Sequence, residues 1–287
     1  MSELPSSAGA AVSARYESLV LHVASRGAAE VLSVAADLAR RFHARLIGVG
    51  AERFNLPPVW DADGGFAYGQ MADDLERQVT ADLLLARVAF EQASAGLEAE
   101  WRPAHDEPGR AVTRAARDAD LIVVAAPDRR GADGEQRPDA ADLVLGSGRP
   151  VLLTPPAVIR LEARRIVVGW KDTREARRAV SDALPLLQLA EEVLVQSVCE
   201  DDGSRAAAHD DAAAVAANLR RRGVEARAEV AVTDAPPAEQ LDIAAAALGA
   251  DLIVTGAYGH SRRAEWAFGG VTRDLLHAPQ RFVLLSH

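Results

Sequence analysis

The sequence predicts an α/β protein made of two doubly wound parallel sheets in tandem. Two observations carry this prediction. The same order of strand and helix patterns runs through the chain twice, and the strand segments are continuous apolar runs such as LIVV (121–124) and LIVT (252–255). Runs of this kind are typical of strands that are buried on both faces of a sheet. Strands that alternate with helices form a parallel sheet with right-handed crossovers.

The first half of the chain supplies one full set of these elements. We expect strands at 16–24, 44–51, 97–104, 120–126 and 150–154, and helices at 27–42, 72–95, 109–117 and 140–145. The helix at 27–42 carries apolar residues along one face, as a helix packed on a sheet must. The stretch Arg53–Gln70 is predicted to be a long loop, and its aromatic residues form a lid or an interface, or else cover their own domain.

The second half repeats the order. We expect strands at 165–170, 192–198, 225–232, 251–255 and 281–286, and helices at 175–189, 206–221, 237–248 and 271–276. The match is best between RDADLIVVAAPD (117–128) and LGADLIVTGAYG (248–259). The predicted organisation is a disordered leader at 1–15, one domain at 16–156 and a second at 165–287, with the boundary at Pro155–Arg164.

Composition narrows the classes of protein to consider. The chain has 287 residues, is 49% hydrophobic and carries a net charge of −10. That acidic balance argues against a nucleic-acid surface, and no apolar run is long enough for a membrane span. The first residues lack the pattern of a signal peptide, so a cytoplasmic protein is expected. The single cysteine, Cys199, excludes an internal disulfide framework.

A glycine-spaced segment follows the strand at 251–255. Gly256 and Gly259 come first, and Gly269 and Gly270 stand directly before the helix predicted at 271–276, which gives the spacing G-x2-G-x9-G. Glycine has no Cβ, so the backbone N–H groups there can approach a phosphate closely. A helix N-terminus adds unpaired N–H groups and a positive dipole end. The segment is therefore predicted to be a phosphate cradle.

A second loop should face this cradle. In a doubly wound sheet, ligands bind outside the carboxyl ends of the strands, at the point where the strand order reverses. The strand at 165–170 ends at Trp170 and is followed by Lys171 and Asp172. The strand at 251–255 is followed by Gly256. We expect these two strand ends to lie on one crevice.

The glycine spacing resembles the nucleotide-binding signature of the universal stress protein family. RIVVGWKDTREARRA (165–179) resembles the opening strand and loop of that family. The resemblance covers nearly the whole second half and, more faintly, 16–156, so the chain is similar to a tandem universal stress protein with two Rossmann-like, adenine nucleotide alpha hydrolase-like domains. It implies an ATP-type ligand with Mg²⁺, adenine near the first loop and phosphates on the glycine loop. The implied binding residues are Trp170, Lys171, Asp172, Gly256, Gly259, His260, Gly269, Gly270, Val271 and Thr272.

The chain departs from the family pattern at three of these positions. Lys171, the single lysine of the chain, stands where the family usually has an aspartate or asparagine, and Asp172 stands where it has a glycine. Gly270 replaces a serine or threonine, whereas Thr272 keeps the second hydroxyl position. Backbone donors survive these changes. Lys171 either pairs with phosphates or neutralises Asp172.

The first half lacks the cradle. Aligning Val151 with Val283 places Arg137 and Pro138 where the second half has Gly269 and Gly270. We therefore expect a degenerate first domain that serves as a pairing partner. Each half ends in an apolar strand that would be an exposed edge in isolation, so the two final strands should pair and form an internal pseudo-dimer. A further homodimer is left open.

Two classes of function remain. The first is an ATP-type nucleotide-binding stress-response or signalling protein, with its site in the second domain. The alternative is a non-nucleotide-binding regulator or scaffold of the same fold. The histidines show no metal-binding spacing, so no metal site is expected on the protein itself. No general base stands beside a nucleophile, so slow ATP hydrolysis is the most enzymatic activity that we expect.

Overall fold

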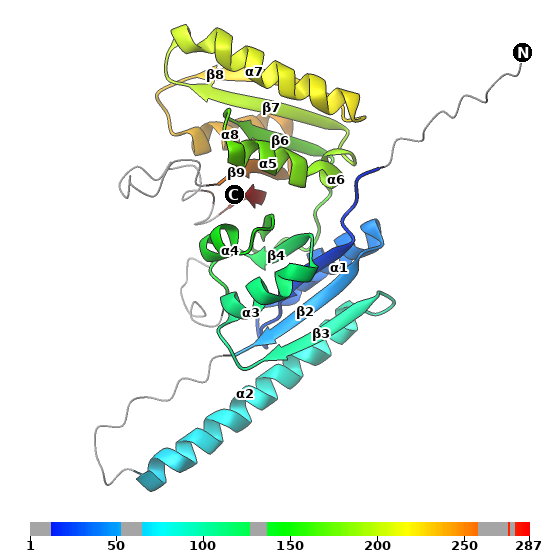
Figure 1. Cartoon of the computed structure of the whole chain (residues 1–287), viewed down its shortest axis with the longest axis vertical. Coiled ribbons are helices and arrows are strands. Elements are labelled where there is room, and N and C mark those ends of the chain that lie inside the picture. The colour runs from blue at the N-terminus through cyan, green and yellow to red at the C-terminus, as the bar shows by residue number, and fades with distance from the viewer. Residues whose placement is uncertain (1–12, 53–64, 127–136, 258–274, 276–278) are drawn as a thin grey trace, which may run out of the picture.

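A computed structural model describes residues 13–52, 65–126, 137–257, 275 and 279–287 of the chain (Figure 1). The strands formed by the described residues belong to one ten-stranded sheet. Numbered in chain order, with the bounds given below, they lie in the order β3-β2-β1-β4-β5-β10-β9-β6-β7-β8. The predicted α/β class and doubly wound topology are confirmed.

The elements follow each other as the repeat predicts. In chain order they are β1 (Ser18–His22), α1 (Ala29–Phe42), β2 (Arg45–Ala51), α2 (Gly65–Ala93), β3 (Ala99–Ala104), α3 (Pro108–Ala115), a 3₁₀ turn (Ala116–Asp118), β4 (Leu121–Ala125), α4 (Ala140–Gly146), β5 (Val151–Thr154), β6 (Arg165–Trp170), α5 (Arg174–Asp182), α6 (Leu184–Leu187), β7 (Glu192–Cys199), α7 (Asp202–Arg221), β8 (Ala226–Val232), α8 (Pro237–Leu248), β9 (Leu252–Gly256) and β10 (Phe282–Ser286).

The two halves meet through their final strands. Within each half the strands are parallel, whereas β5 and β10 pair antiparallel with Leu152 opposite Leu284. This pairing of the last strands is the one that the sequence predicts. It gives a sheet whose order reads the same from either edge, because β3-β2-β1-β4-β5 mirrors β8-β7-β6-β9-β10.

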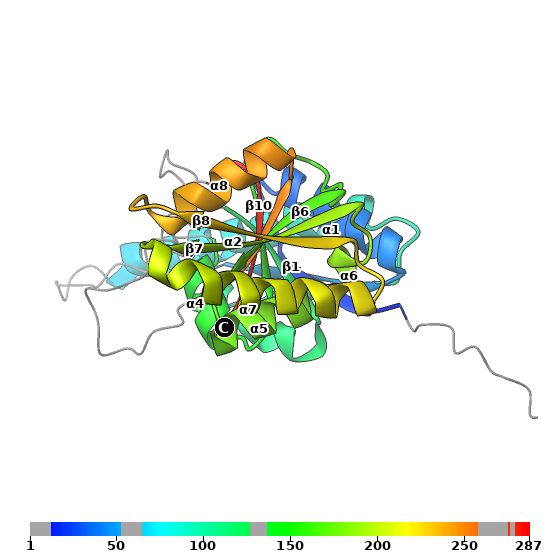
Figure 2. The same ribbon diagram turned by 90° about the horizontal axis from the view of Figure 1, so that it is seen from above.

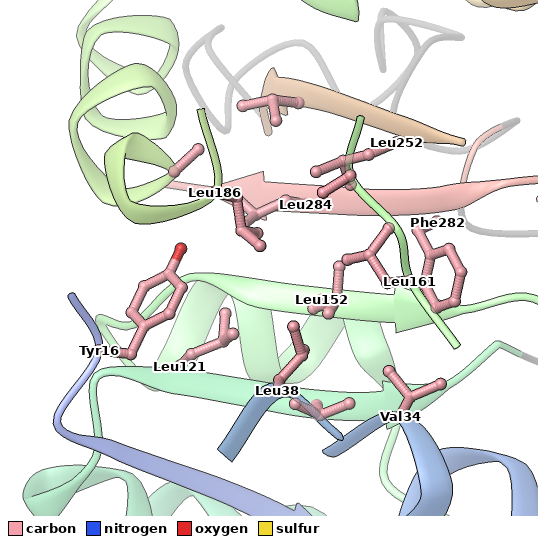
Figure 3. Close-up of a cluster of buried hydrophobic side chains, with 14 of the residues drawn as sticks. Tyr16, Val34, Leu38, Leu121, Leu152, Leu161, Leu186, Leu252, Phe282 and Leu284 are labelled. Atoms are coloured by element: carbon pink, nitrogen blue, oxygen red, sulfur yellow. The ribbon is translucent and has the colours of Figure 1, made fainter. Parts of the chain in front are cut away.

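Helices cover both faces of the sheet. Buried residues of α1, α2, α5, α6 and α7 pack on one face, and those of α3, α4 and α8 pack on the other. Figure 2 shows α7 and α8 on opposite sides of the strands of the second half. Figure 3 shows that the core continues across the junction of the halves, from Leu38 and Leu121 through Leu152 to Leu284 and Leu186. The continuous apolar strands are explained by this burial on both sides.

Equivalent side chains make equivalent contacts in the two halves. The Asp120 carboxylate accepts hydrogen bonds from the N–H groups of Glu17 and Ser18 (2.8 and 3.0 Å). Asp251 does the same for Glu162 and Ala163 (2.9 and 3.0 Å). Each aspartate directly precedes the fourth strand of its half and holds the chain at the start of the first strand or a few residues before it. The sequence repeat is therefore a repeat of contacts as well.

Two predicted element boundaries are wrong. The loop predicted at Arg53–Gln70 is helical from Gly65 onward, because α2 begins there, and residues 53–64 lie outside the described residues. The single helix predicted at 175–189 is divided into α5 and α6. Pro185 explains the division, since it has no N–H to donate to the preceding turn. Among the described helices, none combines the length and the apolar character that a membrane crossing requires.

Candidate functional site

The candidate crevice lies at the carboxyl ends of β6 and β9. These strands are parallel neighbours, with Gly169 opposite Thr255. The loop that begins at Lys171 and the segment that begins at Gly256 therefore leave the sheet side by side. The structure brings together the described residues of the two predicted loops.

Gly256 lies against the first turn of α5. A Cβ added to Gly256 would stand 2.5 Å from the Ala176 nitrogen, 2.6 Å from the Glu175 carbonyl carbon and 2.9 Å from the Glu175 Cβ. Real Cβ atoms do not come so near to backbone atoms, so this position has no room for a side chain. Glycine is required here for the close approach of the strand end to the helix.

The first turn of α5 is capped by protein groups. Thr173 is the N-cap, and its hydroxyl oxygen accepts a hydrogen bond from the Ala176 N–H (3.2 Å). Glu175, which is buried, pairs with the Arg174 guanidinium at 3.0 Å. Burial raises the pKa of Glu175, but its own backbone N–H, Arg174 and His287 lower it by more, so the group is held as a carboxylate. The anion-binding capacity of this helix end is already used by Glu175.

The sequence offered a weak signal for Glu175. A threonine followed by an acid within the first turn marks a helix start. Its burial, however, depends on the approach of Gly256 from a distant part of the chain. We did not predict this residue as part of the site.

Lys171 and Asp172 directly follow β6 and are exposed. Asp172 forms an ion pair with Arg177 at 2.5 Å, so a cationic partner from α5 already offsets its charge. The Lys171 carbonyl accepts a hydrogen bond from the Thr173 N–H at 2.6 Å, which makes a tight turn into α5. Neutralisation of Asp172 therefore does not require Lys171.

Trp170 differs from the other predicted site residues because its side chain belongs to the core on the α5 and α7 face. Its carbonyl accepts a hydrogen bond from the Ser197 hydroxyl at 3.1 Å. The indole Nε1 is buried and has no hydrogen-bond partner among the described residues. A buried donor of this kind costs about 1–3 kcal/mol unless a partner is supplied.

The glycine loop itself falls on residues outside the described part of the chain. These residues include Gly259, His260, Gly269, Gly270, Val271 and Thr272, so their assignment to the site stays a prediction. The point where the loop leaves the sheet is fixed. Ala257 donates its N–H to the Ser286 carbonyl (2.8 Å), and its own carbonyl contacts the His287 Nδ1 (3.0 Å).

The corresponding crevice of the first half is filled. Arg137 reaches over Gly27, where an added Cβ would stand 2.6 Å from its Nη2 atom. The cavity that remains between His22, Gly27, Val124 and Arg137 measures about 20 Å³. That is room for roughly one water molecule, and a nucleotide needs several hundred Å³. Arg137, which stands where the second half has the cradle glycine Gly269, thus places its guanidinium in the crevice of the first half.

His22 is buried beside this filled crevice. Its Nε2 lies 3.1 Å from the Ala51 carbonyl. Burial, reinforced by the nearby Arg137 charge and only partly offset by the Ala51 carbonyl, lowers the pKa of His22 to about 4. The imidazole is therefore neutral at pH 7 and donates its Nε2–H to that carbonyl. In the described residues, no group of three or more histidine, cysteine, aspartate and glutamate side chains is arranged to hold a metal ion.

Solved structures share this fold over most of the chain. A universal stress protein from Archaeoglobus fulgidus DSM 4304 is 16% identical, with a TM-score of 0.67 over 94% of this chain and 98% of that chain. A functionally unknown protein from Pseudomonas aeruginosa PAO1 is 14% identical, with a TM-score of 0.55 over 94% and 92% of the two chains. A protein described as a putative universal stress protein, from Pseudomonas aeruginosa UCBPP-PA14, is 16% identical, with a TM-score of 0.55 over 94% and 93%.

Comparison by sequence finds a match over the second half of the chain. No curated protein shows a significant match to the chain. The model of the universal stress protein family matches residues 162–285, which run from just before β6 to the last residues of β10 and contain the candidate crevice. Residues 162–285 form a universal stress protein domain.

Proposed function

We propose that this protein binds an ATP-type adenine nucleotide, with Mg²⁺, in the crevice of its second half and acts in stress response or signalling through that ligand. The observation that carries the proposal is the contact of Gly256 with the first turn of α5. It holds the Lys171 loop and the start of the glycine loop on one crevice, inside the segment that matches the universal stress protein family.

The charges of the crevice favour one orientation of the nucleotide. The buried Glu175 carboxylate already takes its own backbone N–H and the Arg174 guanidinium at the first turn of α5, so phosphates there would find these donors occupied. The phosphates accordingly belong on the opposite side, on the glycine loop that begins after Ala257. The base then lies toward the Lys171 loop. Mg²⁺, when bound with the nucleotide, would neutralise the phosphate oxygens.

The first half has a different role in this proposal. We infer that it is a degenerate first domain, with its crevice filled by Arg137, and that the two halves form an internal pseudo-dimer. The antiparallel pairing of β5 with β10 supports this inference. The Tyr16 hydroxyl also supports it, since it donates to the Asp182 carbonyl (2.7 Å) across the two halves. One nucleotide site per chain follows.

Calorimetric titration tests the proposed site. We expect protein stripped of ligand to bind ATP with Mg²⁺ at one site per chain. Gly259→Val should weaken binding at least about tenfold, because a branched side chain keeps the phosphate away from the backbone donors. Gly109→Val is the matched control. Gly109 lies in α3 with no atom within 4 Å of an added Cβ, so ATP binding should be unchanged.

The same titration separates the two candidate functions. Equal affinity of parent and Gly259→Val would reject the glycine loop as the phosphate site. Absence of heat up to millimolar ATP would reject nucleotide binding and favour the regulator or scaffold. The Glu175 carboxylate and the departures at Lys171 and Gly270 are the features that speak for this second candidate.

A further inference from the structure

Helix α2 leaves an apolar face uncovered. Its inner face packs on the sheet through Val79, Ala86 and Phe90, which are buried. On its outer side Leu84, Leu85 and Val88 have exposed fractions of 61%, 58% and 43%. Exposed leucines are ordinary when scattered, but three within five residues of one helix form a patch. An exposed apolar patch of this kind is typical of a surface that binds another protein.

The position of α2 leaves this face open to another molecule. Figure 1 shows α2 at the end of the molecule farthest from α7, with the sheet on one side. The final strands β5 and β10 are already paired with each other inside the chain. A second copy of the chain must therefore use a different surface, and α2 offers one.

The outer face of α2 has a coiled-coil spacing. Arg77, Ala81, Leu84, Val88 and Glu91 follow one another at intervals of four, three, four and three residues, and all five are exposed. Such an alternation lines up along one side of a helix and is the seam of a two-helix coiled coil. We call these five residues the α2 seam. Its apolar centre is flanked by a cation at one end and an anion at the other.

The residues of the α2 seam are complementary to those of a second α2 seam that runs in the opposite direction. In an antiparallel pair of α2 helices with a two-fold axis at Leu84, Leu84 meets the partner's Leu84, and Ala81 meets the partner's Val88. Arg77 then meets the partner's Glu91, and this contact occurs twice. A parallel pair would instead set Arg77 against the partner's Arg77. Charge complementarity thus selects a second copy, in antiparallel orientation, as the occupant of the patch.

We propose that the chain forms a homodimer in which the α2 seams of two copies pack antiparallel about Leu84. The geometry is isologous, so it closes at two chains. Leu85 widens the buried centre on one side. Within their own helix, Arg77 pairs with Asp74, and Glu91 pairs with Arg87 (2.7 Å), so both side chains lie on the exposed surface beside an opposite charge. This proposal is independent of nucleotide binding.

Sedimentation equilibrium without nucleotide tests the contact. We expect a reversible monomer–dimer equilibrium for the parent. Leu84→Glu should raise the dimer dissociation constant at least about tenfold, because it buries two like charges at the axis. Ile243→Glu is the matched control, since Ile243 is 53% exposed on α8, and it should leave the equilibrium unchanged. A monomeric parent, or a Leu84→Glu variant that dimerises like the parent, would overturn the proposal.

Charge exchange tests the orientation. Arg77→Glu and Glu91→Arg should each weaken the dimer about fivefold or more, because each sets like charges against each other twice. The double variant Arg77→Glu/Glu91→Arg restores the opposite-charge pairs and should return to within about twofold of the parent. In the double variant both intrahelical pairs, with Asp74 and with Arg87, become pairs of like charge, so recovery can come only from contacts between chains. Additive weakening would exclude the antiparallel seam.

Crosslinking gives a readout that does not depend on affinity. In a Cys199→Ser background, which has no other cysteine, Leu84→Cys places two thiols at the two-fold axis. Mild oxidation should yield a disulfide-linked dimer, because the two cysteines at the axis lie close enough for a disulfide bond. Leu189→Cys, at another exposed position, is the control and should stay uncrosslinked. Equal crosslinking at both positions would argue against the α2 seam.

Discussion

Gly256→Ala is expected to lower the free energy of unfolding by about 1–3 kcal/mol, because a single methyl group there forces backbone to move. The new Cβ would stand 2.5 Å from the Ala176 nitrogen and 2.6 Å from the Glu175 carbonyl carbon. A flexible side chain could rotate away from such a contact. The first turn of α5 cannot, since Thr173 caps it and Arg174 pairs with the buried Glu175. Urea unfolding, followed by far-ultraviolet circular dichroism, measures the loss.

Gly109→Ala provides the matched comparison. Gly109 lies inside α3, and a Cβ added to it meets no atom within 4 Å. Alanine in a helix is favoured over glycine by about 0.5–1 kcal/mol, so this variant should be more stable than the parent. Opposite signs for the same chemical change would show that space, and not backbone entropy, decides the outcome at Gly256. A Gly256→Ala variant as stable as the parent would mean that α5 and β9 can separate without cost.

The fold could be predicted because its signals are local and repeated. The runs 121–124 and 252–255 specify strands buried on both faces wherever they stand in the chain. Exposed apolar edges at the end of each half predict that β5 and β10 pair. These inferences need only periodicity and the avoidance of an open edge, which are properties of short segments.

The beginning of α2 shows where local signals mislead. The segment Arg53–Gln70 is predicted to be a loop, and its glycines Gly65 and Gly69 have poor helix propensity. In the structure the helix begins at Gly65. Once a helix is nucleated, each further residue adds a hydrogen bond at little cost, and residues such as Ala67 and Gln70 are good helix formers. The long helix that follows therefore extends through two unfavourable glycines.

The placement of the two strand ends could be predicted, whereas the electrostatics around them could not. Parallel strand order was enough to set the Lys171 loop beside Gly256. The burial of Glu175 and the pairing of Asp172 with Arg177 were not foreseen. The burial of Glu175 depends on packing between α5 and the end of β9, which are far apart in the sequence, whereas the pairing of Asp172 with Arg177 depends on the tight turn that leads into α5. The remaining candidate residues, from Gly259 to Thr272, lie outside the described residues and are still predictions.

Acid should destabilise this protein partly through His22. The native pKa of His22 is lowered from 6.5 to about 4, chiefly because the imidazole is buried. In the unfolded chain the same group takes up a proton as the pH falls below about 6.5, whereas the native state resists until about pH 4. The unfolded state therefore binds more protons in this window. The neutral, buried His22 therefore contributes its full stabilisation above pH 6.5, the pKa of the unfolded chain. This stabilisation is lost as the pH falls from there through the native pKa of about 4.

The size of this loss follows from the shift of the pKa. It corresponds to about 3 kcal/mol when the pH has fallen to the native value. His22→Gln removes the titration while its amide can still donate to the Ala51 carbonyl, which His22 contacts at 3.1 Å. We expect urea midpoints of this variant to decline less than those of the parent between about pH 7 and pH 4.5. His209→Gln, on the surface of α7, controls for removal of a histidine and should follow the parent.

The comparison must be made as a difference because other groups act in the opposite direction. Burial, together with Asp82, raises the pKa of Glu52, and burial raises that of Asp182. A carboxyl group with a raised native pKa binds protons more readily in the native state, so it favours folding as the pH falls. The parent profile sums these effects, whereas the parent minus His22→Gln isolates the imidazole. A difference that does not change with pH would show that His22 is protonated at the same pH in the native and unfolded states, and would contradict its burial beside Arg137.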